Sequence, residues 1–261
     1  MNHPFCTIER DGRITIVTIN RPEVMNALHW PGHNDLSAAF DEFENDRDQW
    51  IAIVTGAGDR AFCAGNDLKY QHQSDPIPVL PESGFGGLTA RFKLNKPVIA
   101  AVNGIALGGG FEIVLACDIV VASETASFAL AEPRVGWAAL SGGLLRLPKQ
   151  IGLRRAMGMI LTGRRVSAAE GITLGFVNEI VAPHEVMAAA RRWAAEILAC
   201  SPMAIWASKE VMRLDQETAS FKQAMLEQTQ TPATVALFAS EDFREGARAF
   251  AEKRKPDWKG R

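Results

Sequence analysis

The sequence predicts an α/β fold in which a mixed core extends to about residue 200 and a purely helical segment follows. Short apolar runs typical of buried strands alternate with helical patterns over the first 200 residues. Beyond residue 200 no strand pattern occurs. The chain has 261 residues, of which 47% are hydrophobic and 22% charged, so it can bury a sizeable core. We therefore divide it into an α/β core, 1–200, and a helical segment, 201–261.

The first elements follow from the spacing of apolar residues. Residues 13–20, RITIVTIN, alternate polar and β-branched side chains, which is the period of a strand. Residues 50–58 and 96–104 are short apolar runs that end in turns, as buried strands do. A loop that leads into a helix lies between the first two strands. That helix has apolar residues at helical spacing: Leu36, Ala39, Phe40 and Phe43.

Residues 70–90 predict a long, mobile loop. They contain three prolines and several other residues that break regular structure, without any periodicity. Long loops within compact domains often act as lids or binding segments.

The second half of the core predicts helices at 109–117 and 142–163, with short strands at 118–123 and 126–130 between them. The second helix opens on two glycines. Ser167 and Glu170 form a capping box at the start of a further helix. The run VNEIVA, after GF, is the last predicted strand.

The helical segment begins at a clear signal. Ser201 can cap a helix, and Pro202 can occupy its first position. Helical patterns then cover 203–215, 221–231 and 241–255.

Composition excludes several classes of protein. The formal net charge is −2, which suggests neither a nucleic-acid-binding surface nor a basic membrane face. No secretory signal or membrane-spanning run is evident, so we expect a soluble, cytoplasmic protein. The four cysteines are widely separated in apolar settings and predict reduced, buried thiols. His29 and His33 lack the motif of a metal site and are interpreted as turn or surface residues.

Two glycine-containing segments suggest a site for an anion. FCAGNDLK, 62–69, and LGGGFE, 107–112, each follow a predicted strand. Glycine lets a ligand approach the backbone, and a helix start presents unpaired N–H groups. Two such groups aimed at one oxygen would form an oxyanion hole. The alternative is that these glycines serve turns or close helix packing, with Glu112 an ordinary acidic residue of a first helical turn.

A second carboxylate, Glu132, comes directly before Pro133, where a predicted strand ends. A pair of carboxylates in different protonation states can add the elements of water to a double bond. The sequence spacing leaves open whether Glu112 and Glu132 meet.

Seven segments in order resemble the enoyl-CoA hydratase/isomerase (crotonase) superfamily. They are NRPEVMNAL, AFCAGNDLK, KPVIAAVNGIALGGGFEIVLACDIVVAS, FALAEPRVG, GGLLRLPKQIG, LTGRRVSAAEG with GFVNEIV, and FAEKRKPDWKGR. The resemblance covers nearly the whole chain. It implies a crotonase-like spiral of ββα units, a C-terminal helical trimerisation segment, and homotrimers that commonly pair into hexamers.

The resemblance also implies a site and a reaction. The backbone N–H groups of Asn66 and Gly109 would form the oxyanion hole for the thioester carbonyl of an acyl-CoA substrate. Glu112 and Glu132 match the two glutamates that activate water in hydratases, with Glu112 as base and Glu132 as acid. No metal or redox cofactor is implied, because coenzyme A is part of the substrate.

The resemblance assigns further residues to coenzyme A. The stretch that contacts the adenine and nearby phosphates corresponds to Ala64, Asp67, Leu68 and Lys69, with Lys69 a phosphate partner. Near the C-terminus, Lys253 matches a tail that reaches the coenzyme A of a neighbouring subunit in relatives. A solvated helix end is an equal alternative for Lys253.

The chain departs from the hydratase pattern at three positions. Asn66 stands where a small residue is common, Ala139 replaces a proline, and Leu140 replaces a glycine or small polar residue. Trp137 and Leu140 therefore suggest an apolar acyl pocket. Packing of both side chains in the core is the alternative.

Activities other than the hydration of a simple enoyl-CoA remain open. Some segments look closest to carnitinyl-CoA dehydratase-like members, although no acidic partner for a trimethylammonium group is evident. An enoyl-CoA isomerase typically needs one carboxylate, and no nucleophile triad indicates a thioester hydrolase. A non-catalytic coenzyme A- or RNA-binding member of the family is the alternative from another class.

Overall fold

The computed structural model describes residues 3–74, 79–218 and 220–261. The chain forms two compact units. The first is built from the chain up to Phe92 and from Val98–Arg192, and the second from Lys93–Pro97 and Trp193–Arg261. The division thus falls at Arg192/Trp193 rather than after residue 200. The short internal segment Lys93–Pro97 belongs to the same unit as the C-terminal residues.

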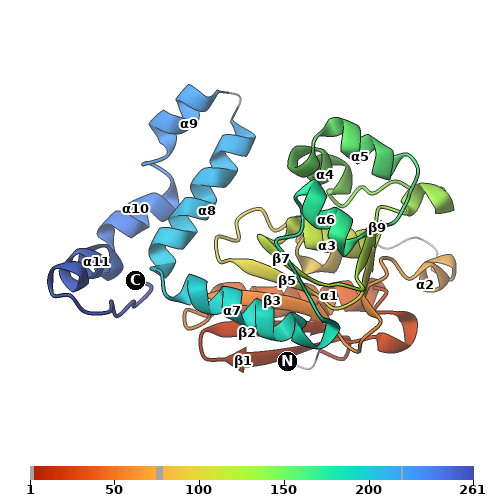
Figure 1. Cartoon of the computed structure of the whole chain (residues 1–261), viewed down its shortest axis with the longest axis horizontal. Coiled ribbons are helices and arrows are strands. Elements are labelled where there is room, and N and C mark those ends of the chain that lie inside the picture. The colour runs from red at the N-terminus through yellow and green to blue at the C-terminus, as the bar shows by residue number, and fades with distance from the viewer. Residues whose placement is uncertain (1–2, 75–78, 219) are drawn as a thin grey trace. The chain divides into compact units, whose positions relative to one another are not determined.

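Two sheets form the framework of the first unit (Figure 1). The larger sheet has the order β1 (Cys6–Asp11), β2 (Ile14–Ile19), β3 (Ile51–Gly56), β5 (Val98–Val102), β7 (Ile119–Ser123) and β10 (Glu179–Val181). The smaller sheet has the order β4 (Ala61–Cys63), β6 (Ile105–Leu107), β8 (Ser127–Ala129) and β9 (Val166–Ser167). Among the strand pairs of the described residues, β1–β2 and β8–β9 are antiparallel and the others parallel.

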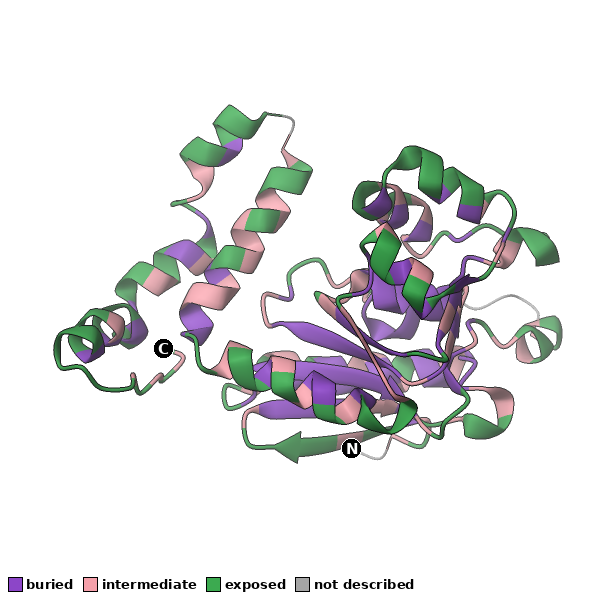
Figure 2. Cartoon of the chain, viewed as in Figure 1, coloured by how far each residue is buried: buried purple, intermediate pink, exposed green. Residues whose placement is uncertain are grey.

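Consecutive strands from β3 to β8 alternate between the two sheets, and a helix follows each pair. This repeat is the ββα spiral that the resemblance implied. The parallel strands β3 and β5 are buried along their whole length (Figure 2), which explains why both appear in the sequence as continuous apolar runs. The edge strand β1 was not predicted, because most of its residues are exposed and polar.

The remaining elements of the first unit are helical. The α-helices are α1 (Trp30–Asn45), α2 (Leu68–His72), α3 (Gly109–Ala116), α4 (Gly143–Ile151), α5 (Leu153–Ile160) and α6 (Ala168–Leu174), and α7 (Val186–Leu198) runs through the division. Short 3₁₀ turns cover Pro22–Val24, Phe85–Gly87, Glu132–Val135 and Pro183–Glu185. The predicted apolar face of α1 is confirmed, since all four of its residues are buried.

The helix predicted over 142–163 is two helices. Gly152 has φ +83° and separates α4 from α5, because a left-handed residue cannot continue an α-helix. The cap at α6 is confirmed, since the Ser167 side chain accepts a hydrogen bond from the Glu170 amide. The reciprocal half of the capping box is absent, because the Glu170 carboxylate pairs with Arg164.

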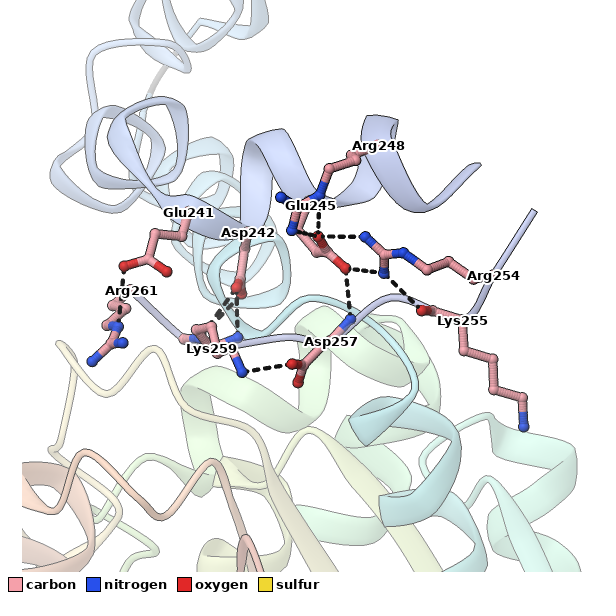
Figure 3. Close-up of polar contacts among 10 residues, drawn as sticks. Glu241, Asp242, Glu245, Arg248, Arg254, Lys255, Asp257, Lys259 and Arg261 are labelled. Carbon is pink, nitrogen blue, oxygen red and sulfur yellow. Dashed lines mark hydrogen bonds and ion pairs between the residues drawn. The ribbon is translucent and has the colours of Figure 1, made fainter. Parts of the chain in front are cut away.

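The second unit contains α8 (Pro202–Glu217), α9 (Phe221–Glu227), α10 (Pro232–Ala239) and α11 (Glu241–Ala251). The predicted start of α8 is confirmed, because the Ser201 side chain accepts from the Ala204 amide and Pro202 is the first helical residue. After α11 the terminal residues fold back along it (Figure 3). The buried Asp242 carboxylate accepts hydrogen bonds from the amides of Lys259, at 2.7 Å, and Gly260.

Two expectations about individual segments need correction here. The predicted mobile loop 70–90 is in part regular, because α2 ends within it and the 3₁₀ turn at Phe85 is buried; residues 75–78 lie outside the described residues. His29 and His33 are buried rather than exposed, and His33 Nδ1 accepts from the Gly86 amide.

Two of the four free thiols, Cys6 and Cys63, are buried as expected, and burial raises the pKa of each to about 12. Cys117 is half-buried and Cys200 is exposed, so the prediction of burial was wrong for Cys200, which follows the end of α7. Among the described residues, no helix has both the length and the low charge needed to cross a bilayer.

Candidate active site

The segment after β4 is held by an isolated bridge between Leu28 and Asn66. The Leu28 amide donates to the Gly65 carbonyl, and the Asp67 amide donates to the Leu28 carbonyl, each at 2.8 Å. In such pairing, the middle residue turns its own N–H away from the partner strand. Within the described residues the Asn66 amide has no acceptor, so it is available to a ligand.

Each glycine of the 108–110 triplet is required for a separate reason. Gly108 has φ +55° and ψ −127°, a backbone conformation for which only glycine is suited, and it precedes α3. A Cβ on Gly109 would lie 2.4–2.6 Å from Phe85 ring atoms, and one on Gly110 would lie 2.0 Å from the Cys63 carbonyl oxygen. The triplet therefore lets α3 begin in close contact with its neighbours.

The two segments lie side by side. A Cβ built on Gly65 would lie 2.7 Å from the Leu107 carbonyl oxygen and 3.4 Å from the Gly109 amide nitrogen. Gly109 is the first residue of α3, so its amide has no partner within the helix, and it has none elsewhere in the described part of the chain. The structure thus brings an available amide at Asn66 near one at Gly109, with the positive end of the α3 dipole behind the latter.

Glu112 lies in the first turn of α3 and is only 3% exposed. Its Oε1 accepts a hydrogen bond from the Gly143 amide, at 2.9 Å. Burial, together with the nearby Glu132 charge, raises the pKa of Glu112 to about 7, against the opposing effects of the Gly143 and Ser141 amides and Arg146. A carboxyl group with this pKa can exchange protons near neutral pH.

Glu132 is the first residue of the 3₁₀ turn that follows β8. Its Oε2 is buried and has no hydrogen-bond partner among the described residues. Burial raises the pKa of Glu132, partly offset by its own backbone amide. Its Oε1 would lie 3.0 Å from a Cβ on Gly108, whose carbonyl accepts from the Glu112 amide at 3.0 Å. The Glu132 charge contributes to the raised pKa of Glu112, so the two carboxylates lie close enough to interact.

The residues matched to coenzyme A are spread over two places. Leu68 and Lys69 are exposed on α2, and the Ala64 amide donates to the Met25 carbonyl. Lys253 is exposed in the second unit, after the end of α11, with φ +53°. The Asp67 carboxylate is engaged within the protein, as an ion pair with Arg21 and as the cap of α2.

Trp137 and Leu140 are 48% and 80% exposed, whereas Ala139 between them is buried. The alternative that both large side chains pack in the core is therefore wrong, because the segment 133–138 lies at the surface of its unit. Contact of Trp137 and Leu140 with an acyl group stays a prediction.

Sequence reasoning missed several residues that shape the site. Gly143 and Arg146 lie in the segment GGLLR, and Arg21 in NRPEVMNAL, but neither motif by itself says what its side chains contact. Gly108 could not be distinguished from its two neighbours. Among the residues that the structure describes, no three His, Cys, Asp or Glu residues are grouped so that they could hold a metal ion.

Comparisons with known proteins agree over nearly the whole chain. Residues 9–261 match the family model described as enoyl-CoA hydratase/isomerase. Carnitinyl-CoA dehydratase from Salmonella arizonae is 41% identical over 255 residues, 97% of each chain, and that from Proteus mirabilis is 41% identical over 252 residues, 96% of each chain. A crystal structure of enoyl-CoA hydratase from Mycobacterium tuberculosis H37Rv has a TM-score of 0.91 and 39% identity, covering 99% of this chain and 100% of its own.

Proposed function

Because the chain belongs to the enoyl-CoA hydratase/isomerase family, we propose that it catalyses the reversible addition of water across the α,β double bond of an enoyl-CoA thioester. The observation that carries this proposal is the interacting pair formed by the buried Glu112 and the half-buried Glu132, whose Oε2 is buried and whose charge raises the pKa of Glu112. An isomerase needs one such group to move a proton, whereas hydration needs a base for water and an acid for carbon.

In this proposal, the amides of Asn66 and Gly109 bind the thioester oxygen. Charge develops on that oxygen as water adds to the β-carbon, and two fixed N–H dipoles stabilise the resulting enolate. Both amides lack protein acceptors in the described residues, which supports the assignment. Removing one such donor typically costs about 10²–10³ in kcat.

Glu112 is the base and Glu132 the acid. As the water oxygen bonds to the β-carbon, one of its protons passes to the Glu112 carboxylate, and Glu132 delivers a proton to the α-carbon. The dehydration direction reverses both transfers. A pKa of about 7 suits Glu112 to this task, and the close pair titrates as a unit.

Other parts of the proposal concern binding and assembly. Leu68, Lys69 and the backbone at Ala64 and Asp67 contact coenzyme A, Lys253 reaches the coenzyme A of a neighbouring subunit, and Trp137 and Leu140 border the acyl group. The chain forms a homotrimer or hexamer. Large exposed apolar side chains in the second unit support this assembly, namely Phe221, Met225, Leu226, Phe238, Phe243 and Phe250.

A second candidate is the dehydration of carnitinyl-CoA. It is favoured by the relatives at 41% identity that carry this name and uses the same two glutamates. A trimethylammonium group would require an aromatic or acidic partner, and the half-exposed ring of Trp137 is the candidate for that partner.

The test is a substrate panel with the purified full chain. With crotonyl-CoA and with longer and branched enoyl-CoAs, the assay follows the loss of the conjugated enoyl absorbance. With carnitinyl-CoA, whose dehydration creates the double bond, it follows the gain of that absorbance. Glu112→Gln and Glu132→Gln should each lower kcat by about 10²–10⁴. Wild-type inactivity on every substrate would refute the proposal, and unchanged rates in both variants would refute the two-glutamate mechanism.

A further inference from the structure

We infer that Arg21 is a positioning residue that fixes the direction of the Asn66 N–H bond, acting through Asp67. This inference rests on the proposed function, in which that N–H is half of the oxyanion hole. Its basis is a set of hydrogen bonds that holds the residues on both sides of Asn66 and leaves the Asn66 amide itself without a protein acceptor in the described residues.

The bridge to Leu28 sets the direction in which the Asn66 N–H points. Its two 2.8 Å hydrogen bonds engage the carbonyl of Gly65 and the amide of Asp67. If either bond lengthens, the peptide between Gly65 and Asn66 can rotate, and the N–H turns with it. A displacement of about 1 Å at a catalytic group can lower a rate by about 10²-fold.

Arg21 forms hydrogen bonds to the residues next to both partners of this bridge. Its Nη1 donates to the Ala27 carbonyl, at 2.5 Å, next to Leu28, and to Asp67 Oδ2, at 3.0 Å, next to Asn66. One cationic nitrogen therefore joins the two strands of the bridge from the side. The Arg21 and Asp67 side chains are each only 12% exposed, so solvent screens this contact weakly.

Both ends of this connection are themselves fixed. The Arg21 amide donates to Asn26 Oδ1, and the Arg21 carbonyl accepts from the Asn26 amide. Asp67 Oδ1 accepts from the Tyr70 amide and so caps α2. Burial alone would raise the pKa of Asp67, but the Tyr70 amide and the Arg21 guanidinium lower it, which keeps the carboxylate charged.

The Asn66 side chain is held away from the bridge by a separate contact. Its Nδ2 donates to Gln71 Oε1 on α2. Asn66 is thereby tied to the same helix that Asp67 caps. The orientation of the amide thus depends on Arg21 and Asp67 rather than on packing of the Asn66 side chain.

The primary test compares Arg21→Met with wild type by two readouts. In steady-state kinetics with crotonyl-CoA, kcat should fall about 10–100-fold, while KM changes less than threefold. The second readout needs no turnover: acetoacetyl-CoA ionises to an enolate with its own ultraviolet absorbance, and an aligned oxyanion hole favours that form. A tenfold loss of enolate stabilisation would raise the pH of half-ionisation of the bound ligand by about 1.

Two further variants separate positioning from folding. Arg21→Lys keeps a cationic nitrogen that can donate to both acceptors, and it should recover at least a third of the wild-type kcat. Arg60→Met is the matched control, because Arg60 donates to the Pro22 carbonyl of the same turn without contacting Asp67, and it should leave both readouts unchanged.

The possible results are distinct. An active wild type with unchanged kcat and enolate absorbance in Arg21→Met overturns the positioning role alone. Equal losses in Arg21→Met and Arg60→Met, or losses that Arg21→Lys does not recover, overturn it as well, because they indicate a general effect on the turn. A wild type that neither hydrates any enoyl-CoA nor binds the enolate overturns the proposed function and, with it, the role of Arg21.

Discussion

The buried carboxylate of Glu112 accepts a hydrogen bond from the amide of Gly143, 2.9 Å away, so the first residue of α4 holds a side chain of α3. This contact stabilises the charged form of Glu112 inside the protein, whereas burial and Glu132 stabilise the neutral form. The balance of these effects determines how the site responds to pH.

The rate of hydration should depend on pH through Glu112. A base must be ionised, so kcat/KM for crotonyl-CoA should fall as the pH drops below about 7, the pKa of Glu112. Arg146→Met removes a charge that favours ionised Glu112. The fall of kcat/KM on the acidic side of the pH profile should therefore move to higher pH. Lys149→Met, on the exposed side of α4, is the control. A fall that stays at the same pH in Arg146→Met would contradict the assignment.

Glu112→Gln should stabilise the fold at alkaline pH. The folded pKa of Glu112 is raised, so folding is favoured most below about pH 4.5, and that contribution is lost as pH rises through about 7. The cost of the buried charge approaches about 3 kcal/mol at pH 8. Thermal unfolding should therefore show a higher Tm for Glu112→Gln at pH 8 and little change at pH 4.5. The exposed Glu124→Gln should show no gain at either pH, and an equal gain there would exclude this explanation.

Gly108→Ala should abolish most activity. Backbone strain at φ +55° costs about 1–3 kcal/mol, and the new Cβ would stand 3.0 Å from Glu132 Oε1. Gly175→Ala is the matched control, because Gly175 also has positive φ but nothing within 4 Å of its Cβ. Both variants should lose stability, measured by urea unfolding, but only Gly108→Ala should lose kcat. Equal kcat values in the two variants would show that the backbone conformation at Gly108 does not affect the reaction.

Asp242→Ala should destabilise the second unit. Asp242 is 1% exposed and accepts from the amides of Lys259 (Figure 3) and Gly260. It also accepts from Ser201 Oγ. Removing the carboxylate leaves these donors without their acceptor, at a cost of about 2–4 kcal/mol.

Asp257→Ala, in the same tail, removes only an exposed ion pair with Lys259 and should cost less than about 1 kcal/mol. Chemical denaturation of the full chain measures both variants. Equal losses would show that the tail contributes nothing specific through Asp242.

The sequence predicted most of the elements because their apolar patterns are local. Strands such as β3 and β5 are buried on both faces, and the caps at Ser167 and Ser201 depend only on residues three positions away. Features that depend on distant partners could not be read in this way. His33 is buried because Phe85 and Gly86, some fifty residues later, pack and bond against it.

The candidate site shows the same limit. The residues alone suggested an anion site near a carboxylate and offered Glu132 as a second one, and the family resemblance paired Glu132 with Glu112 and identified the two amides. Neither indicated that Glu132 lies against Gly108, because that contact depends on how β6 and β8 pair. The break at Gly152 was also invisible, since helical spacing continues on both sides of it.

The chain between Glu132 and Gly143 joins one proposed proton carrier to the group that tunes the other. This stretch also carries Trp137 and Leu140, the side chains proposed to meet the acyl group. We therefore expect that exchanging this stretch for the corresponding stretch of a relative would change the substrate preference and the pKa of Glu112 together. Under the proposed roles, we expect substitutions in this stretch that favour new acyl groups also to shift the pH dependence of the rate.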